Sequence, residues 1–254
     1  MILIHSGAVV AVDMLGQNYV LLSVWVESIP RFSPGQFMMV RLSEGYDPLL
    51  LRPFSILDAH EGVYRFLIKV VGKGTRAVRG FRYGRKVLLT GPFGNGFPGA
   101  ARHGTIIVAG GAGIASVFSL VQRLHERGIA YELLYGARTE AELVLSDLLR
   151  PYDPIISTDD GSRGHYGRLT DVLAKRIKGK KAVFACGPLP MLAAVADLSL
   201  RHTIECYVSI EARMACGFGV CLGCTIIDGA GNTRRVCRDG PVFNARDIVL
   251  PGVC

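Results

Sequence analysis

Four cysteines near the C-terminal end constrain the fold of this chain most strongly. Cys216, Cys221 and Cys224 follow a C-x4-C-x2-C pattern, and Cys237 comes after twelve further residues. This is the spacing of plant-type [2Fe–2S] sites, in which four thiolates hold two irons. Such a cluster carries one electron at a time, so the pattern predicts an electron carrier with a segment wrapped around a metal cluster.

Glycines alternate with the cysteines in this segment. Gly217, Gly219 and Gly223 allow the backbone to turn sharply and to approach the cluster closely. Backbone N–H groups can then point at the sulfurs and tune the reduction potential.

A zinc site and a disulfide framework are the alternatives for these cysteines. A structural zinc site usually pairs two C-x2-C knuckles, and only Cys221 and Cys224 have that form, so zinc is the less favoured metal. A disulfide framework suits small secreted chains. Residues 1–5 show no basic start of a secretory signal, and the total of seven cysteines is odd.

Three cysteines lie outside the pattern. We expect Cys186 and Cys206 to be buried as small apolar residues. Cys254 is the last residue, so it lacks the three following residues that a prenylation signal needs.

Length and charge limit the remaining possibilities. The chain has 254 residues, half of them hydrophobic, which is enough for two compact domains and a small cluster segment. The net charge of +8 suits anionic dinucleotides and an acidic partner surface. A basic run with interleaved aromatic residues would predict nucleic-acid binding, but the sequence contains no such run. Residues 105–122 are uncharged, but glycines interrupt them, so we expect a strand, a turn and a helix rather than a membrane span.

The first hundred residues have the pattern of β-strands. Tyr64, Phe66 and Ile68 alternate with Arg65 and Leu67, as in a strand with one buried face. Residues 20–26 and 86–90 are further strands, and turn signals separate them. Short strands at this spacing predict an antiparallel β-barrel.

From about residue 104 strands and helices alternate, which indicates βαβ units around a parallel sheet. The fold class is therefore multi-domain: a barrel in residues 1–98, an α/β nucleotide domain in residues 99–205 and a cluster segment in residues 206–254. The expected strands are residues 105–109, 131–135, 155–158, 182–185 and 204–209, and the expected helices are residues 114–127, 139–150, 169–177 and 189–200.

A glycine-rich turn joins the first strand and helix of the second domain. Gly111, Gly113 and Ser116 approximate G-x-G-x-x-G with a small last residue. Glycine lets the backbone approach a pyrophosphate at a helix N-terminus, although a plain tight turn has the same pattern. At the end of the next strand, Glu140 suits NAD and Arg138 suits a 2′-phosphate.

Two barrel segments have residues suited to a flavin nucleotide. In Arg52-Pro53-Phe54-Ser55 the arginine can bind a phosphate bidentately and the serine can meet a flavin ring, although the string could simply begin a strand. Lys69-Val70-Val71 is followed by the small-residue turn Gly74-Thr75, which suits a phosphate.

The order of these motifs resembles the ferredoxin–NADP reductase superfamily. The resemblance implies a flavin-binding barrel followed by a nicotinamide-nucleotide domain. It rests on Arg52-Pro53-Phe54-Ser55, Gly74-Thr75, Gly91-Pro92-Phe93-Gly94, Gly110-Gly111-x-Gly113-Ile114 and Cys186-Gly187-Pro188, in that order. One departure is Ser116, where that superfamily often has proline.

The same resemblance implies which residues hold the cofactors. The residues implied for FAD are Arg52, Pro53, Phe54, Ser55, Lys69, Val70, Val71, Gly74 and Thr75. Those implied for NAD(H) are Gly110, Gly111, Gly113, Ile114, Cys186, Gly187 and Pro188.

The last third of the chain narrows the resemblance. The string from Glu211 to Cys224, followed by Val236-Cys237-Arg238-Asp239-Gly240-Pro241-Val242-Phe243, is similar to the electron-transfer subunits of NAD-dependent (class B) dihydroorotate dehydrogenases. In that family electrons pass between NAD(H) and a catalytic subunit through FAD and a [2Fe–2S] cluster held by the four cysteines. The family therefore implies an FMN-containing partner, a heterotetramer with two of each subunit, a cytoplasmic location and a role in de novo pyrimidine (UMP) synthesis.

Two alternatives remain at this level. One is an NAD(P)H-dependent flavin/iron–sulfur subunit of a ferredoxin transhydrogenase, hydrogenase or sulfide reductase complex. The other is a binding or regulatory protein that senses redox state through its cysteines and has no steady NADH oxidation.

Overall fold

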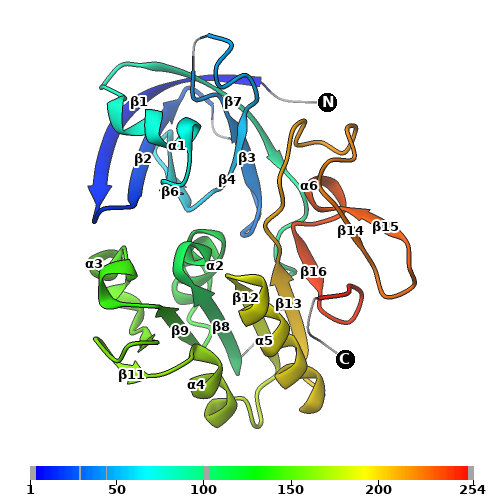
Figure 1. Cartoon of the computed structure of the whole chain (residues 1–254). Coiled ribbons are helices and arrows are strands. Elements are labelled where there is room, and N and C mark those ends of the chain that lie inside the picture. Colours follow the sequence, from blue (N-terminus) through cyan, green and yellow to red (C-terminus); the bar gives the residue numbers. More distant parts are fainter. Residues whose placement is uncertain (1–3, 29, 44, 100–102, 251–254) are drawn as a thin grey trace.

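The fold consists of two seven-stranded sheets and a C-terminal segment packed beside both of them (Figure 1). The computed structural model describes residues 4–28, 30–43, 45–99 and 103–250. The first sheet lies at the top of Figure 1, and the second sheet with its helices lies below it.

The first sheet is antiparallel throughout and has the order β4-β3-β7-β1-β2-β6-β5. It curls so that β4 and β6 contact each other, which gives the expected barrel-like form. Its strands are β1 (Ile4–Leu15), β2 (Tyr19–Val26), β3 (Phe37–Val40), β4 (Arg52–Ser55), β5 (Asp58–His60), β6 (Val63–Lys69) and β7 (Lys86–Phe93).

Three strands of this sheet, β1, β3 and β5, were not predicted. β3 has four buried residues and no alternation, and strands that short give no periodic signal. β1 contains a register shift between Val9 and Ala11, which breaks its period of two.

The second sheet is parallel except at one edge. Its order is β11-β10-β9-β8-β12-β13-β16, and only β16 runs antiparallel to its neighbour. The strands are β8 (Thr105–Gly110), β9 (Tyr131–Ala137), β10 (Ile155–Thr158), β11 (His165–Tyr166), β12 (Ala182–Cys186), β13 (Glu205–Ser209) and β16 (Val242–Asn244). β16 comes from the cluster segment, residues 206–254, so that segment adds a strand to the nucleotide sheet.

Three helices of the second domain agree with the sequence-based prediction. They are α2 (Ile114–Glu126), α4 (Leu169–Arg176) and α5 (Leu189–Arg201). The predicted helix over residues 139–150 is wrong. This stretch consists of a 3-10 turn, Glu140–Glu142, then α3 (Ser146–Leu149) and a second 3-10 turn, Arg150–Tyr152. Leu145 has a left-handed backbone with φ 65°, which interrupts any continuous helix.

The barrel and the nucleotide domain share one apolar core. Tyr19 and Leu67 on the barrel join a buried cluster with Ile114 and Phe118 of α2. Phe97, just after the last barrel strand, meets the ring of Phe184 on β12 edge to face at 5.6 Å. The two domains are therefore held in one relative position by buried side chains.

The C-terminal segment packs against the same two domains. After β13 it forms the loop with three of the cysteines, the hairpin β14 (Thr225–Ile227) with β15 (Thr233–Arg235), and α6 (Val236–Asp239). Its Cys224 and Cys237 belong to a buried cluster with Met39 of β3 and Val208 of β13. Elsewhere Cys186 and Cys206 are buried, as expected, whereas Cys254 lies outside the described residues.

None of the helices in the described ranges is long and apolar enough to cross a membrane.

We expect Phe184→Ala to lower the free energy of unfolding by about 3–5 kcal/mol, the usual cost of a large cavity in a packed core. Phe184 is fully buried and also stacks on Tyr207 at 5.5 Å. The measurement is urea unfolding followed by circular dichroism. Tyr166→Ala removes an aromatic ring that is 74% exposed and should cost far less. Equal costs for the two variants would contradict the shared core of the two domains.

Candidate functional site

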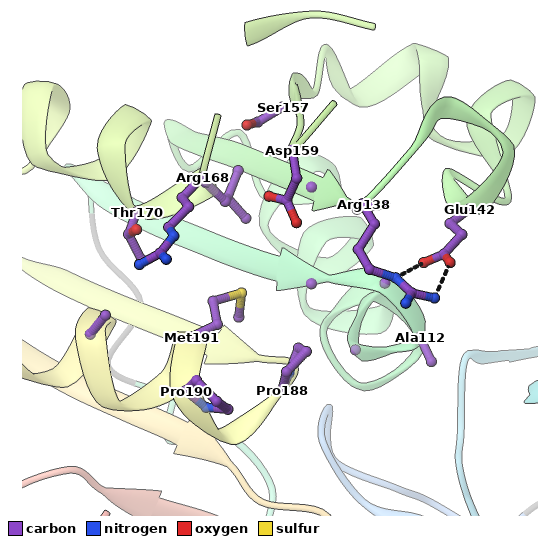
Figure 2. A pocket seen from close by; sticks show the side chains of 18 of the residues that line it. Ala112, Arg138, Glu142, Ser157, Asp159, Arg168, Thr170, Pro188, Pro190 and Met191 are labelled. Atoms are coloured by element: carbon purple, nitrogen blue, oxygen red, sulfur yellow. Dashed lines mark hydrogen bonds and ion pairs between the residues drawn. The ribbon is translucent and has the colours of Figure 1, made fainter. Parts of the chain in front are cut away.

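A cavity of about 560 Å³ opens where the nucleotide domain faces the barrel. Figure 2 shows side chains from β9, β10, α4 and the start of α5 pointing into it. The carboxyl ends of neighbouring parallel strands surround this cavity, which is where open α/β sheets bind their ligands. Lys69, at the end of β6, reaches the cavity from the barrel.

The glycine turn and the Cys186-Gly187-Pro188 loop, predicted separately to bind NAD(H), form adjoining walls of this cavity. A Cβ atom on Gly113 would stand 2.2 Å from the carbonyl oxygen of Cys186, and one on Gly110 would stand 2.9 Å from Cδ of Pro188. Only residues without side chains allow this approach. The N-terminus of α2 therefore faces the cavity, where its N–H groups favour a phosphate.

A buried polar cluster lies behind these walls. The hydroxyl groups of Ser116 on α2 and Ser209 on β13 share a hydrogen bond of 2.9 Å. Both are near the Cys186 thiol, whose pKa burial raises to about 12. Cys186 is thus a neutral thiol at neutral pH. Ser116, the departure from the proline of the resembled superfamily, uses its hydroxyl in this cluster.

Cations and carboxylates line the cavity in equal number. The cations are Lys69, Arg138 and Arg168, and the carboxylates are Glu142, Asp159 and Glu211. Glu211 is open to the cavity on one side, but burial against the wall raises its pKa, and the nearby Lys69 opposes that rise. Lys69 also lies over the ring of Tyr19, 5.6 Å from its centre. Charged groups from the barrel, the nucleotide domain and the cysteine segment therefore meet here.

The loops after β9 and β10 form the far end of the cavity. Arg138 donates to both carboxylate oxygens of Glu142, with Nε 3.3 Å from Oε2 (Figure 2). Asp159 points into the cavity from the end of β10. Glu140, the acidic residue that the sequence suggested for NAD, is not among the lining residues and lies 3.6 Å from Arg163 instead.

The residues predicted for FAD form a second group on the barrel. The Thr75 hydroxyl accepts hydrogen bonds from the N–H groups of Val71 at 3.0 Å and of Gly72 at 3.1 Å. Gly74 is buried beside Arg52, so that a Cβ there would stand 3.6 Å from Nε of Arg52. A guanidinium beside a residue without a side chain is a donor set that fits a phosphate. Pro53, Phe54 and Ser55 continue from Arg52 along the half-buried edge strand β4. Lys69 and Val70 lead to Gly74 and Thr75, which lie in the short helix α1 (Lys73–Ala77) and not in the turn that the sequence suggested.

The cysteines of the C-terminal segment lie close together. The Cys237 N–H donates to Sγ of Cys224 at 3.4 Å. Burial opposes ionisation of Cys216, but N–H groups of Cys221 and other loop residues point at its sulfur and lower its pKa to about 6. Burial and the adjacent Cys224 raise the pKa of Cys237 to about 12, so a metal must displace that proton on binding.

A two-iron cluster is inferred from the spacing of the four cysteines, not from the positions of their side chains. Within the ranges that the structure describes, no three His, Cys, Asp or Glu side chains surround a single-ion position. A [2Fe–2S] cluster distributes its four thiolates over two irons, so it does not require them to converge on one point.

The loop that carries the cysteines is fixed to the barrel by close contacts. A Cβ on Gly217 would stand 2.5 Å from Met39 of β3. The ring of Phe218 lies 6.4 Å from that of Phe93 at the end of β7. The Asn95 side chain donates to the carbonyl of Asp239 at 3.0 Å, two residues after Cys237.

Several lining residues escaped the sequence analysis: Glu142, Ser157, Asp159, Arg168, Thr170, Met191, Glu211. Asp159 and Arg168 follow strands in the sequence, and the rule that ligands bind at the carboxyl ends of parallel strands could have pointed to them. Nothing in the sequence marks Met191, which faces the cavity from the first turns of α5.

Comparisons with known proteins agree with this architecture. A family model described as the iron–sulfur cluster binding domain of dihydroorotate dehydrogenase B matches residues 211–249. A model described as an oxidoreductase NAD-binding domain matches residues 107–197. The first match favours iron–sulfur over zinc, and the second favours an enzyme subunit over a protein that only senses redox state.

Two curated relatives cover most of the chain. The dihydroorotate dehydrogenase B (NAD(+)) electron transfer subunit of Bacillus caldolyticus is 37% identical over 225 residues, 85% of this chain and 87% of that protein. The subunit of the same name from Lysinibacillus sphaericus (strain C3-41) is 34% identical over 251 residues, 95% of this chain and 97% of that protein.

Two solved structures share the fold to different extents. An NADH-dependent reduced ferredoxin-NADP oxidoreductase superposes with a TM-score of 0.83 at 26% identity, covering 97% of this chain and 91% of that one. The ferredoxin reductase of a carbazole 1,9a-dioxygenase has a TM-score of 0.68 at 23% identity, covers 80% of this chain and 66% of that one, and shows the fold alone.

The barrel, the nucleotide domain and the cysteine segment together define an oxidoreductase subunit of the ferredoxin-reductase type that uses FAD, NAD(H) and a [2Fe–2S] cluster. At these identities and coverages, the chain belongs to the family of dihydroorotate dehydrogenase B electron transfer subunits.

We expect Gly113→Ala to weaken NADH binding by about tenfold or more, because the new methyl group must push the glycine turn away from the Cys186 carbonyl. The measurement is an NADH titration followed by fluorescence. Gly80→Ala is the matched control, because a Cβ at Gly80 meets no atom within 4 Å. Unchanged NADH affinity in Gly113→Ala would contradict the placement of the nucleotide at this turn.

Proposed function

We propose that this chain passes electrons between NAD(H) and a dihydroorotate dehydrogenase catalytic subunit, through FAD on the barrel and a [2Fe–2S] cluster on the four cysteines. The partner is an FMN-containing catalytic subunit, and the two chains form a heterotetramer with two copies of each. In this complex the chain takes part in pyrimidine (UMP) synthesis.

One observation carries the proposal: the cysteine segment contacts both the barrel and the nucleotide cavity. Met39 of the barrel packs against Gly217 in the cysteine loop, and Glu211 at the start of the same segment lines the cavity. A chain that only bound a dinucleotide would not need a metal-binding loop folded against its flavin domain.

The three cofactors divide the chemistry between two-electron and one-electron transfer. NADH gives up a hydride, a [2Fe–2S] cluster accepts single electrons, and a flavin supplies the conversion between the two.

Each nucleotide has its own group of residues in this proposal. Arg52 together with Gly74 and Thr75 in α1 holds the phosphates of FAD, while Ser55 and residues 69–71 contact the rest of that cofactor. The glycine turn before α2 and the Cys186-Gly187-Pro188 loop hold NAD(H) in the cavity. The dinucleotide binds there because the N-terminal N–H groups of α2 face the cavity and favour its phosphates.

The cluster site has the properties of an electron exit. Cys216, Cys221, Cys224 and Cys237 are its proposed ligands. Cys221 is exposed, and the apolar side chains on either side of it, Val220 and Leu222, are 72% and 58% exposed. Exposed apolar side chains beside a metal ligand favour a protein partner that covers them. We propose that the catalytic subunit docks there.

A cytoplasmic location also belongs to this proposal. Of the six cysteines that the structure describes, Cys186 and Cys206 lie outside the cluster pattern, and both are free. Free thiols are typical of reducing compartments, and disulfides of oxidising ones.

A second candidate follows from the structural comparison. The TM-score to an NADH-dependent reduced ferredoxin-NADP oxidoreductase is 0.83. A role as a transhydrogenase subunit is therefore the second candidate after the first proposal. The two candidates differ in the partner that the cluster serves. Dihydroorotate-dependent reduction of NAD+ by the purified complex supports the first candidate. NADPH-dependent reduction of ferredoxin, with no dihydroorotate-dependent reduction of NAD+, supports the second.

We expect Cys221→Ser to reduce dihydroorotate-to-NAD+ electron transfer by at least about 100-fold, since a hydroxyl group is a poor substitute for a thiolate on iron. NADH oxidation by an artificial dye that takes electrons from the flavin should stay within about twofold. Both rates are measured on the complex with its catalytic subunit, and cluster content is measured by absorbance.

Cys206→Ala is the control for this experiment, because Cys206 is buried in β13, outside the cluster segment's four-cysteine pattern. It should retain both activities. An equal loss of both activities in Cys221→Ser would show that the metal serves folding rather than electron transfer.

A further inference from the structure

The hydroxyl group of Tyr19 lies buried behind the glycine turn of the nucleotide cavity and has no hydrogen-bond partner among the described residues. We infer that Tyr19 is a further binding residue for the dinucleotide: its O–H donates to the pyrophosphate of NAD(H) on the turn of residues 110–113. The inference rests on the proposed function, because it adds a residue of the barrel to the same nucleotide site.

Tyr19 begins β2 at the interface of the two domains, and packing fixes its side chain. Only 2% of the residue is exposed, and it belongs to the buried cluster that the barrel shares with the nucleotide domain. β2 pairs with β6 so that Tyr19 stands opposite Lys69, whose Nζ lies 5.6 Å from the centre of the phenol ring. Beside them the N–H of Val70 donates to the carbonyl of Asn18 at 2.8 Å. The fold therefore holds the hydroxyl in one place before any ligand binds.

An unpaired hydroxyl at this depth needs an explanation, because buried polar groups nearly always have a partner. Two other buried phenols show the usual case. Tyr64 donates to the carbonyl of Pro30 at 3.1 Å, and Tyr135 donates to that of Val144 at 3.1 Å. An unpaired donor costs the protein stability, so a ligand that supplies an acceptor recovers that free energy on binding.

The unpaired hydroxyl faces the turn that is proposed to hold the pyrophosphate. Gly111 in this turn has a left-handed backbone with φ 53°. A Cβ built on Gly111 would lie 3.7 Å from Oη of Tyr19, and no other described atom beyond the turn and its helix would lie within 4 Å of it. A ligand oxygen in that space would have to come only about 1 Å closer to accept a hydrogen bond. Because the hydroxyl has almost no contact with solvent, the turn shifts by a similar amount as the ligand binds.

The surroundings of Tyr19 keep its hydroxyl a donor. Burial raises its pKa, and the carboxylate of Glu142 adds to the rise, whereas Arg138 opposes it. The phenol is therefore protonated at neutral pH. Hydrogen bonds to a charged acceptor such as a pyrophosphate oxygen are stronger than those between neutral groups.

Calorimetry with two ligands tests the inference on the FAD-loaded protein. NAD+ and ADP-ribose share the pyrophosphate, but only NAD+ has the nicotinamide ring. We expect Tyr19→Phe to weaken the binding of both by about tenfold, because each loses one hydrogen bond to a charged acceptor. In NADH oxidation by a dye, KM should rise by a similar factor while kcat stays within about twofold. Without any nicotinamide ligand, Tyr19→Phe should melt about 2–4 °C higher, because it lacks the unpaired buried hydroxyl.

Tyr64→Phe is the matched control, because it removes a buried hydroxyl that already has a partner within the barrel. It should bind both ligands like the wild type and melt at a lower temperature, since the Pro30 carbonyl loses its donor. Unchanged affinities in Tyr19→Phe, a loss for NAD+ alone, a loss of FAD or a lowered melting temperature overturns the inference, while NADH oxidation by the wild type leaves the proposed function intact. If neither ligand binds the wild-type protein, the proposed function fails with it.

Discussion

Close backbone packing around the nucleotide cavity is the constraint on which the rest of the structure depends. Gly113 and Cys186 meet at a distance that no side chain permits, and Gly94 meets the carbonyl of Gly240 in the same way, 2.5 Å from where its Cβ would stand. The first contact joins the two walls of the nucleotide cavity. The second joins the end of the barrel to the residues that follow Cys237. The first contact therefore shapes the nucleotide cavity, and the second fixes the cysteine segment relative to the barrel.

The buried side chains around these contacts make the arrangement rigid. Tyr19 and Leu67 bury one face of the barrel against α2, and Met39 and Phe93 bury another against the cysteine loop. The barrel is therefore held from two sides, by the domain that binds NAD(H) and by the segment that carries the cysteines. Electron transfer between bound groups benefits from fixed geometry, because no domain movement is needed to bring donor and acceptor together.

Charged side chains divide the cavity into two ends. Lys69 from the barrel and Glu211 from the cysteine segment lie close together at one end of the cavity, while Arg138, Glu142 and Asp159 lie at the far end. Because the cations and carboxylates balance, the phosphate-binding capacity comes mainly from the glycine turn and the N-terminus of α2.

Much of this organisation was predictable from the sequence, because it depends on local patterns. The cysteine spacing, the glycine turn before α2 and the alternation in β6 each follow from neighbouring residues, and the order of the motifs indicated the family. The structure was needed where distant segments meet. No local pattern shows that β16 pairs with β13, that Glu211 enters the cavity, or that Asp159 and not Glu140 lines it. The prediction of a helix over residues 139–150 failed for a local reason. The left-handed backbone that interrupts it is at Leu145, and a leucine gives no sequence signal for that conformation, as a glycine would.

The central claim is that electrons entering at the nucleotide cavity reach the cluster within this single chain. An anaerobic titration of the FAD- and cluster-loaded protein with NADH, followed by absorbance and by electron paramagnetic resonance, tests it most directly. We expect flavin bleaching to be accompanied by the signal of a reduced [2Fe–2S] cluster in proportion to the NADH added. Full flavin bleaching with a cluster that stays oxidised, although dithionite reduces it, would contradict the claim.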